Sequence, residues 1–204
     1  MSNDKKNIFF VNLKCAYSSF NDLAKQGKLK KISHRWSLAW IKNDEYKIKN
    51  LPKDVKFWMV VRCPYKRFLS FYKDKFIKCF DKNINVNQSC QINMYKYFDK
   101  KKIENLEFKI SDLIKSIKLG YFDSHLEHQN EILDCRFVEN IKKKINFLKL
   151  ESEDFNKIVK NLIGFQLNKG NSTSYLTHIT LSESEKKFVK DYYKKDFEIF
   201  NYDK

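Results

Sequence analysis

Several features that mark common protein classes are missing from this 204-residue sequence. Its five cysteines are odd in number and include no C-x-x-C pair, which argues against a disulfide framework and a cysteine-ligated zinc ion. No apolar run approaches the roughly 20 residues that a membrane span needs. The N-terminus also lacks a convincing signal peptide. We therefore expect a protein of the reducing cytoplasm without a membrane span.

Arginine is scarce, although the chain is strongly basic. Lys and Arg number 41 and Asp and Glu 25, a formal net charge of +16, yet the arginines are only Arg35, Arg62, Arg67 and Arg136. Proteins that read nucleic acids favour Arg for bidentate contacts, whereas scattered Lys usually forms a solvated surface. Specific nucleic-acid binding is therefore the alternative and not the leading hypothesis.

Short apolar runs alternate with stretches of helical periodicity. With 42% apolar and 16% aromatic residues, the chain can bury a core, and we expect one domain over residues 1–204 with an insertion around 81–100. The apolar runs predict strands at 7–13, 56–62 and 146–150. Helices are expected at 20–25, 64–76, 103–119, 125–145, 151–162 and 182–197. This alternation predicts an α/β fold, a parallel sheet covered by helices on both faces.

Local signals mark several helix ends. Pro64 suits the first turn of a helix, where a missing N–H costs nothing. Ser182 and Glu185 have the spacing of a capping box. The acidic residues of 151–154 favour a first helical turn, and Gly164 favours the end of the same helix.

The segment between the first strand and its helix is a candidate anion site. Ligands of α/β sheets bind at the carboxyl ends of strands, where helix N-termini offer N–H groups. Lys14 could neutralise a leaving oxygen, while Ser18 and Ser19 could cap the helix and donate hydrogen bonds to an oxyanion. A plain helix cap beside an exposed lysine would have the same pattern. The triphosphate loop G-x-x-x-x-G-K-[ST] is absent, which argues against a P-loop phosphotransferase.

A second candidate lies after the second strand. Arg62 ends that strand and Ser70 follows about two helical turns after Pro64, so both could hold one phosphate group. Arg67 could contact the same ligand or pair with an acidic residue at the edge of the sheet, and we favour the pairing.

These two segments resemble the donor-binding motifs of sulfotransferases. Residues 14–20 (KCAYSSF) are similar to the 5′-phosphosulfate loop, and residues 61–72 (VRCPYKRFLSFY) to the 3′-phosphate motif. Similar landmarks follow in the same order at 125–129, 147–155 and 193–202. The resemblance covers nearly the whole chain and is closest to the carbohydrate sulfotransferases, the group of heparan 2-O and chondroitin-type enzymes and bacterial relatives.

The resemblance implies a three-layer fold like that of P-loop NTPases and a donor, 3′-phosphoadenosine 5′-phosphosulfate (PAPS), used without a metal. It implies that Lys14 contacts the bridging oxygen and that Arg62 and Ser70 hold the 3′-phosphate. The residues implied around the 5′ group are Cys15, Ala16, Tyr17, Ser18 and Ser19. Lys169, Asn171 and Ser172 resemble a loop that folds over the nucleotide, although a solvated loop would explain them equally well.

Three residues depart from the motifs. Ala16 replaces a usual glycine, Tyr17 is bulky where small residues are common, and Cys63 stands where Asp or Asn is usual. These changes bear on donor affinity. Cys15 and Cys63 are also expected at neighbouring strand ends, where oxidation could join them, although a reduced pair is the expectation.

Transfer of a sulfuryl group to a hydroxyl needs a base that titrates near neutrality, so the four histidines are candidates. His34 follows a predicted short strand at 28–33 and precedes Arg62 by 28 residues. The resembled group carries a histidine there, so His34 is the predicted base and an acceptor contact. His125 is the second candidate, either as base or in the acceptor cleft. His128 and His178 are expected to be structural or surface groups.

The acceptor has no signature of its own. The resemblance favours a hydroxylated saccharide, and the positive charge would attract an anionic one. The sequence indicates nothing about oligomeric state.

Overall fold

The computed structural model describes most of the chain, and the fold follows from these residues. They are 1–2, 6–30, 54–77, 97–99, 101–102, 105, 107–134, 141–168 and 178–202. The chain divides into two compact units. Unit 1 comprises residues 1–63, 127–171 and 195–204, and unit 2 comprises residues 64–126 and 172–194.

A parallel sheet forms the centre of unit 1. Its strands are β1 (Asn7–Val11), β2 (Lys56–Val61) and β3 (Ile145–Lys149), in the order β1-β2-β3. The register pairs Val11 with Val60 and Val61 with Lys149. Residues 59–61 of the central strand are fully buried, as expected for a parallel strand covered on both faces. Three of the four predicted strands are therefore confirmed, each within about a residue or two of its expected limits.

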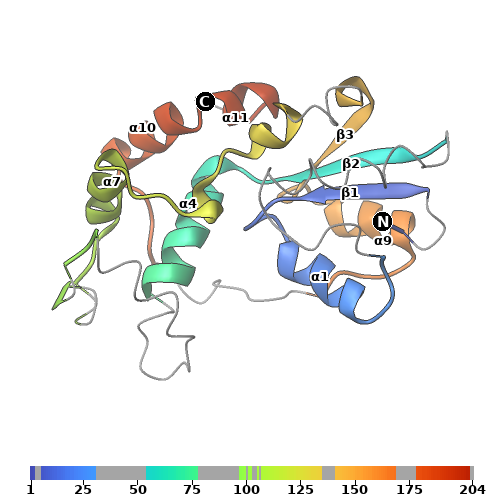
Figure 1. Ribbon diagram of the computed structural model, residues 1–204, viewed down its shortest axis with the longest axis horizontal. Coiled ribbons are helices and arrows are strands. Elements are labelled where there is room, and N and C mark those ends of the chain that lie inside the picture. The colour runs from blue at the N-terminus through green and yellow to red at the C-terminus, as the bar shows by residue number, and fades with distance from the viewer. Residues whose placement is uncertain are drawn as a thin grey trace. The chain divides into compact units, whose positions relative to one another are not determined.

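Helices cover both faces of this sheet (Figure 1). Helices α1 (Tyr17–Lys25) and α9 (Phe155–Ile163) pack on one face, where Val60 and Leu148 meet Phe20 and Val159. On the other face Met59 packs against η5 (Gln129–Asp134) and against Phe200, which follows α11 (Lys194–Ile199). Unit 1 is thus a three-layer α/β structure, which confirms the predicted fold class. A 3₁₀ turn, η6 (Lys142–Lys144), leads into β3.

Unit 2 is helical. It contains α4 (Pro64–Tyr72), a π-helical turn η2 (Lys73–Ile77), α7 (Ile110–Lys118), a 3₁₀ turn η4 (Ser124–Leu126) and α10 (Glu183–Tyr192). Its core is aromatic: the Phe76 ring stacks on Phe108 at 4.5 Å between ring centroids and meets Phe98 edge-on at 5.1 Å. Pro64 begins α4 as predicted, because its fixed φ suits a first helical turn.

Two other predicted helix ends are confirmed. Ser182 and Glu185 form the expected capping box at the start of α10, with each side chain accepting from the backbone N–H of the other. Gly164 ends α9 at a φ of 77°, a left-handed conformation that glycine adopts without strain.

The expected start of the helix near 151 is wrong. Helix α9 begins at Phe155, so Glu151 is outside it. The Glu151 carboxylate instead accepts hydrogen bonds from the Cys63 N–H and the Tyr202 hydroxyl, each at 3.1 Å. These long-range partners hold Glu151 out of a helical turn.

Three other helix limits also differ from the sequence prediction. In the described part of 103–119 the α-helix starts only at Ile110. In the described part of 125–145 there are short 3₁₀ turns, and the backbone N–H of Gln129 is bonded to Asp196. Helix α10 stops before Tyr193, whose buried hydroxyl donates to the Leu126 carbonyl at 2.9 Å. At Gln129 and Tyr193, bonds to residues distant in the sequence accompany the departure from local periodicity.

Some expectations fall partly or wholly outside the described residues. In the predicted strand at 28–33, Leu29 makes a single antiparallel bridge with Ser2, and residues 31–33 are not described. Most of the predicted insertion at 81–100 is likewise not described, so it stays a prediction, as does the single domain. Within the described ranges, no helix is both long and apolar enough to cross a membrane.

Candidate active site

The loop after β1 has an unusual backbone. Lys14 and Ala16 have φ values of 64° and 62°, which lie in the left-handed region that non-glycine residues seldom occupy. Ala16 is the N-cap of α1, and its side chain makes no capping hydrogen bond. The first N–H groups of a helix have no partner within the helix, and turns of this kind form anion-binding concavities in other proteins. The arrangement suits an anion at the carboxyl end of β1.

Arg62 lies beside this loop at the carboxyl end of β2. Its Nη1 donates to the carbonyl of Lys14 at 2.9 Å, and its Nε is 3.8 Å from Oε1 of Glu151. The two segments that the sequence identified, 14–19 and Arg62, therefore meet within unit 1. The guanidinium is about one-quarter exposed, with a side-chain exposure of 24%. One side of the Arg62 guanidinium thus supports the loop after β1 through its bond to Lys14.

Glu151 was missed as a site residue. It follows β3, so it reaches the same edge of the sheet as Arg62 and the loop after β1. Its signal in the sequence, an acidic residue directly after a buried strand, was interpreted as a first helical turn. Burial, together with the charge and hydrogen bond of Glu151, raises the pKa of Tyr202 above its usual value, so Tyr202 acts here as a neutral donor.

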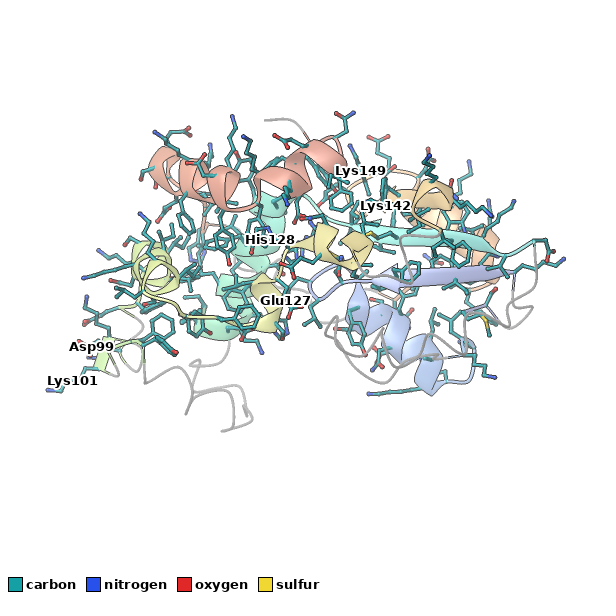
Figure 2. The ribbon with its side chains drawn as sticks, turned by 45° about the horizontal axis from the view of Figure 1, so that its top comes forward. Asp99, Lys101, Glu127, His128, Lys142 and Lys149 are labelled. Atoms are coloured by element: carbon teal, nitrogen blue, oxygen red, sulfur yellow. The ribbon has the colours of Figure 1, made fainter. Side chains whose placement is uncertain are left out.

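A second cation lies at this edge of the sheet. Lys149 ends β3 and is labelled in Figure 2. Its Nζ donates to the Asn201 carbonyl at 2.6 Å and lies 4.7 Å from the centre of the Tyr202 ring. The sequence reasoning did not single it out among the 37 lysines, because a scattered lysine carries no signal until the strand ends are known.

The side chains that follow Ala16 make other contacts than the sequence predicts. Ser18 and Ser19 lie inside the first turn of α1 and do not cap it, so the capping prediction is wrong. The Ser19 hydroxyl donates to the Asn168 carbonyl at 2.7 Å, which uses its single proton. The Tyr17 hydroxyl donates to Oδ1 of Asn21 at 3.0 Å, so its ring is directed along α1. Burial raises the pKa of Tyr17 to about 12.

Buried polar residues missed by the sequence reasoning support the ends of β1 and β2. Gln129 and Asp196 are both 0% exposed. The Gln129 amide bonds to the backbone of Arg62 and to Sγ of Cys15, while Asp196 accepts the N–H groups of Gln129 and Asn130. Glu127 and His128, which directly precede Gln129 in the chain, are labelled in Figure 2. The cysteines that the structure describes, Cys15 and Cys63, are both free thiols.

Unit 2 holds the second histidine candidate. Nδ1 of His125 is 2.6 Å from Oδ1 of Asp123, which also accepts the His125 backbone N–H at 2.8 Å. The imidazole stacks on Phe71 with ring centroids 6.1 Å apart. Burial alone would raise the pKa of Asp123, but the hydrogen bonds and charge of His125, with the charge of Lys75, outweigh burial and hold it below its usual value.

The remaining predicted residues are in unit 2 or are not described. Ser70 is half-buried in α4. Arg67, also in α4, is 2% exposed, and its guanidinium lies 5.7 Å from the Tyr193 ring. His34, Lys169, Asn171 and Ser172 lie outside the described residues. Within the part of the chain that is described, no three His, Cys, Asp or Glu side chains form a group suited to a metal ion.

The family of the chain follows from a comparison with family models. The model of the sulfotransferase family matches residues 1–203, so the chain belongs to that family and is an enzyme that transfers a sulfuryl group. Comparisons with curated proteins and with solved structures found no match.

Proposed function

We propose that this enzyme transfers the sulfuryl group of PAPS to a hydroxyl group of a carbohydrate, with a histidine as general base. The observation that carries the donor assignment is the meeting of Arg62 with the left-handed turn at Lys14 and Ala16. The resemblance of these segments to the two donor motifs of carbohydrate sulfotransferases supports the same donor. The saccharide acceptor rests on that resemblance alone.

The residues of unit 1 fit the charges of such a donor. A nucleotide with a 5′-phosphosulfate and a 3′-phosphate needs two anion sites. The turn before α1, with Lys14 and the first N–H groups of the helix, supplies one site. Arg62 supplies a guanidinium for the other, where a bidentate pair with phosphate is stronger than a single neutral hydrogen bond. Ser70 stays a sequence prediction for the same phosphate.

The reaction that we propose is an in-line exchange at sulfur. The acceptor oxygen forms a new bond to sulfur while the bond from sulfur to the bridging oxygen breaks, and its electron pair stays on the 5′-phosphate. The acceptor proton goes to the histidine. The roles of this chain are to hold the donor, to place Lys14 beside the oxygen that gains charge, and to accept the proton. The positive charge of Lys14 and the helix N–H groups would stabilise the negative charge that develops on that oxygen.

His34 stays the first candidate for the base because of its predicted place, and His125 stays the second. The environment of His125 supports this second candidacy. Since Nδ1 is bonded to Asp123, the neutral imidazole keeps its proton on Nδ1 and leaves Nε2 as a proton acceptor. A carboxylate in this position also stabilises the imidazolium after proton transfer.

The first experiment is a thermal-shift and calorimetry screen of the full chain with 3′-phosphoadenosine 5′-phosphate (PAP), the donor product, against AMP, ATP, NADPH and duplex DNA. We expect selective stabilisation by PAP, a preference for PAP over AMP, and loss of that preference in Arg62→Ala. Lys14→Ala should weaken both PAP and AMP, because it removes the cation at the 5′ group. A chain that binds DNA with a steep salt dependence and shows no preference for PAP would instead support nucleic-acid binding.

Activity assays then separate the two histidines. His34→Ala and His125→Ala are compared for PAP affinity and for sulfuryl transfer to a panel of saccharides. The base variant should lose transfer by about 100-fold or more while PAP affinity is kept. Full activity of His34→Ala with every acceptor that wild type uses would transfer the assignment to His125.

A further inference from the structure

The end of β2 is completed by a side chain and not by a neighbouring strand. The Leu150 N–H donates to the Val61 carbonyl at 2.8 Å, on the side of β3. Since the peptide groups of successive strand residues point to opposite sides, those of Arg62 point to the side of β1. The pairing of β1 with β2 ends at Val11 and Val60, so β1 does not extend far enough to meet them.

The Gln129 amide takes that place. Its Oε1 accepts the Arg62 N–H at 2.8 Å, and its Nε2 donates to the Arg62 carbonyl at 2.8 Å. One side chain therefore satisfies both backbone groups of Arg62, as a strand would. The same Oε1 accepts Sγ of Cys15 at 3.1 Å, from the loop after β1. A single amide thus ties the arginine to the loop.

Gln129 is itself held rigidly. It is 0% exposed, and its backbone N–H donates to Oδ2 of Asp196 at 2.9 Å, while Oδ1 of Asp196 accepts the Asn130 N–H at 2.8 Å. Gln129, Asn130 and Asp196 are all buried, so the loss of either bond would leave a polar group without water to replace its partner. The guanidinium of Arg62 in turn donates to the Lys14 carbonyl at 2.9 Å. The chain of contacts runs from α11 through Gln129 to Arg62 and the loop.

We propose that Gln129 is a positioning residue for the donor, a side chain that fixes Arg62 relative to the loop at Lys14–Ala16 so that one nucleotide can reach both. This inference rests on the proposed donor. Gln129 itself does not touch the nucleotide. Its loss should therefore reduce the advantage that a 3′-phosphate gives a ligand, more than it reduces the binding of a ligand that has only a 5′ group.

The test uses the ratio of two dissociation constants, that of AMP to that of PAP, measured by calorimetry on the full chain. Gln129→Met keeps the volume and removes the amide. We expect this ratio to fall by about tenfold, the effect of losing roughly one well-aligned hydrogen bond to Arg62. A variant that only loosened the fold would weaken both ligands alike and leave the ratio unchanged.

Asn146→Ala is a control at an exposed position of β3, where another side-chain amide bonds to the backbone of β2. Its Nδ2 donates to the Phe57 carbonyl at 3.2 Å, so it removes another amide bond to the backbone of β2, away from its carboxyl end. We expect the AMP-to-PAP ratio of this variant to equal that of wild type. An equal fall in both variants would mean that Gln129 acts only through general stability, and would overturn the proposal.

Gln129→Glu gives a second test that does not depend on Gln129→Met folding well. The ionised carboxylate cannot donate to the Arg62 carbonyl, whereas the protonated acid can. The titratable groups beside it are Asp196 of α11, 3.5 Å from Nε2, and Cys15, while Arg62 presents its peptide group. Burial next to Asp196 disfavours ionisation, so the acid form should be reached well within the stable pH range.

We expect the AMP-to-PAP ratio of Gln129→Glu, divided by that of wild type at the same pH, to recover toward one as the pH falls from 8 to about 5.5. A quotient that stays low down to pH 5.5 would overturn the proposal. If wild type itself shows no preference for PAP, the proposed donor fails. If wild type shows it and both Gln129 variants keep it, only the positioning role fails.

Discussion

Ala16 holds a backbone conformation that glycine would adopt at lower cost. Its φ of 62° explains why glycine is usual at this place in the resembled loop, and why a small residue replaces it. A left-handed conformation costs a residue with a Cβ about 1–2 kcal/mol. The departure from the motif is therefore tolerated by the backbone at a modest cost.

Substitutions at Ala16 test that cost. Ala16→Val should lower the free energy of unfolding by about 1–3 kcal/mol, because branching at Cβ increases the strain. Ala16→Gly should leave it unchanged or raise it by up to about 1 kcal/mol, after the gain in unfolded-chain entropy is counted. Urea denaturation measures both. Ala24→Gly, within α1, is the control and should destabilise by about 1 kcal/mol. Equal stability of the Val and Gly variants at 16 would contradict the φ value.

Asp123 gives a prediction of pH dependence. Its pKa is lower in the folded state than its ordinary value of about 3.9, so its contribution to stability is present above that value. The contribution is lost as the pH falls through the folded pKa. Asp123→Asn should therefore be less stable than wild type at pH 7, and the difference should shrink below about pH 4. Urea denaturation at several pH values checks this, and His125→Ala should shrink the same difference at pH 7.

At the scale of elements, helix ends show where local chemistry and tertiary contacts agree. Helix α10 starts at a complete capping box, in which the Ser182 N–H donates to Oε2 of Glu185 at 2.8 Å and the Ser182 hydroxyl accepts the Glu185 N–H at 3.4 Å. Helix α9 lacks such a cap. It begins at Phe155, and Glu151 instead bonds to Cys63 and Tyr202. A cap recognised in sequence is therefore reliable only where its side chains have no stronger long-range partner.

Removing this cap has a predictable cost. Ser182→Ala should lower the free energy of unfolding by about 1 kcal/mol, because one helix N–H loses its acceptor. Ser111→Ala, which removes an exposed serine hydroxyl in α7, is the control and should change stability by less than about 0.5 kcal/mol. Denaturant titration compares the two. Equal losses in both variants would show that the cap contributes nothing at Ser182.

At the scale of the whole molecule, the net charge of +16 affects the rate at which charged ligands associate with the protein more than it affects the fold. Among the described residues, the contacts of Arg62 and Lys149 place these two cations at the carboxyl end of the sheet. Three lysines, residues 142–144, are exposed in η6. Such charges would attract an anionic acceptor, if the enzyme uses one, over a distance that salt limits to about 8 Å at physiological ionic strength.

Salt should therefore separate charged from neutral acceptors. We expect kcat/KM for an anionic saccharide to fall as NaCl rises from 50 to 300 mM, because long-range attraction is screened, with kcat changing little. An uncharged saccharide of the same length is the control, and its kcat/KM should stay nearly constant. An equal decline of kcat/KM for both acceptors would mean that salt acts on donor binding or on the stability of the fold, and not on the attraction of the acceptor.

The sequence by itself determined the elements whose signals are local. Buried apolar runs predicted the three strands of the described sheet, while Pro64, Gly164 and the box at Ser182 marked helix ends, because each depends on residues within one turn of it. Motif resemblance then placed Lys14 and Arg62 at strand ends. Only the tertiary structure decided which side chains hold those ends together. Gln129 is 67 residues from Arg62, and Glu151 is 88 residues from Cys63. A hydrogen bond between such partners exists only after the chain has folded, so no local pattern announces it.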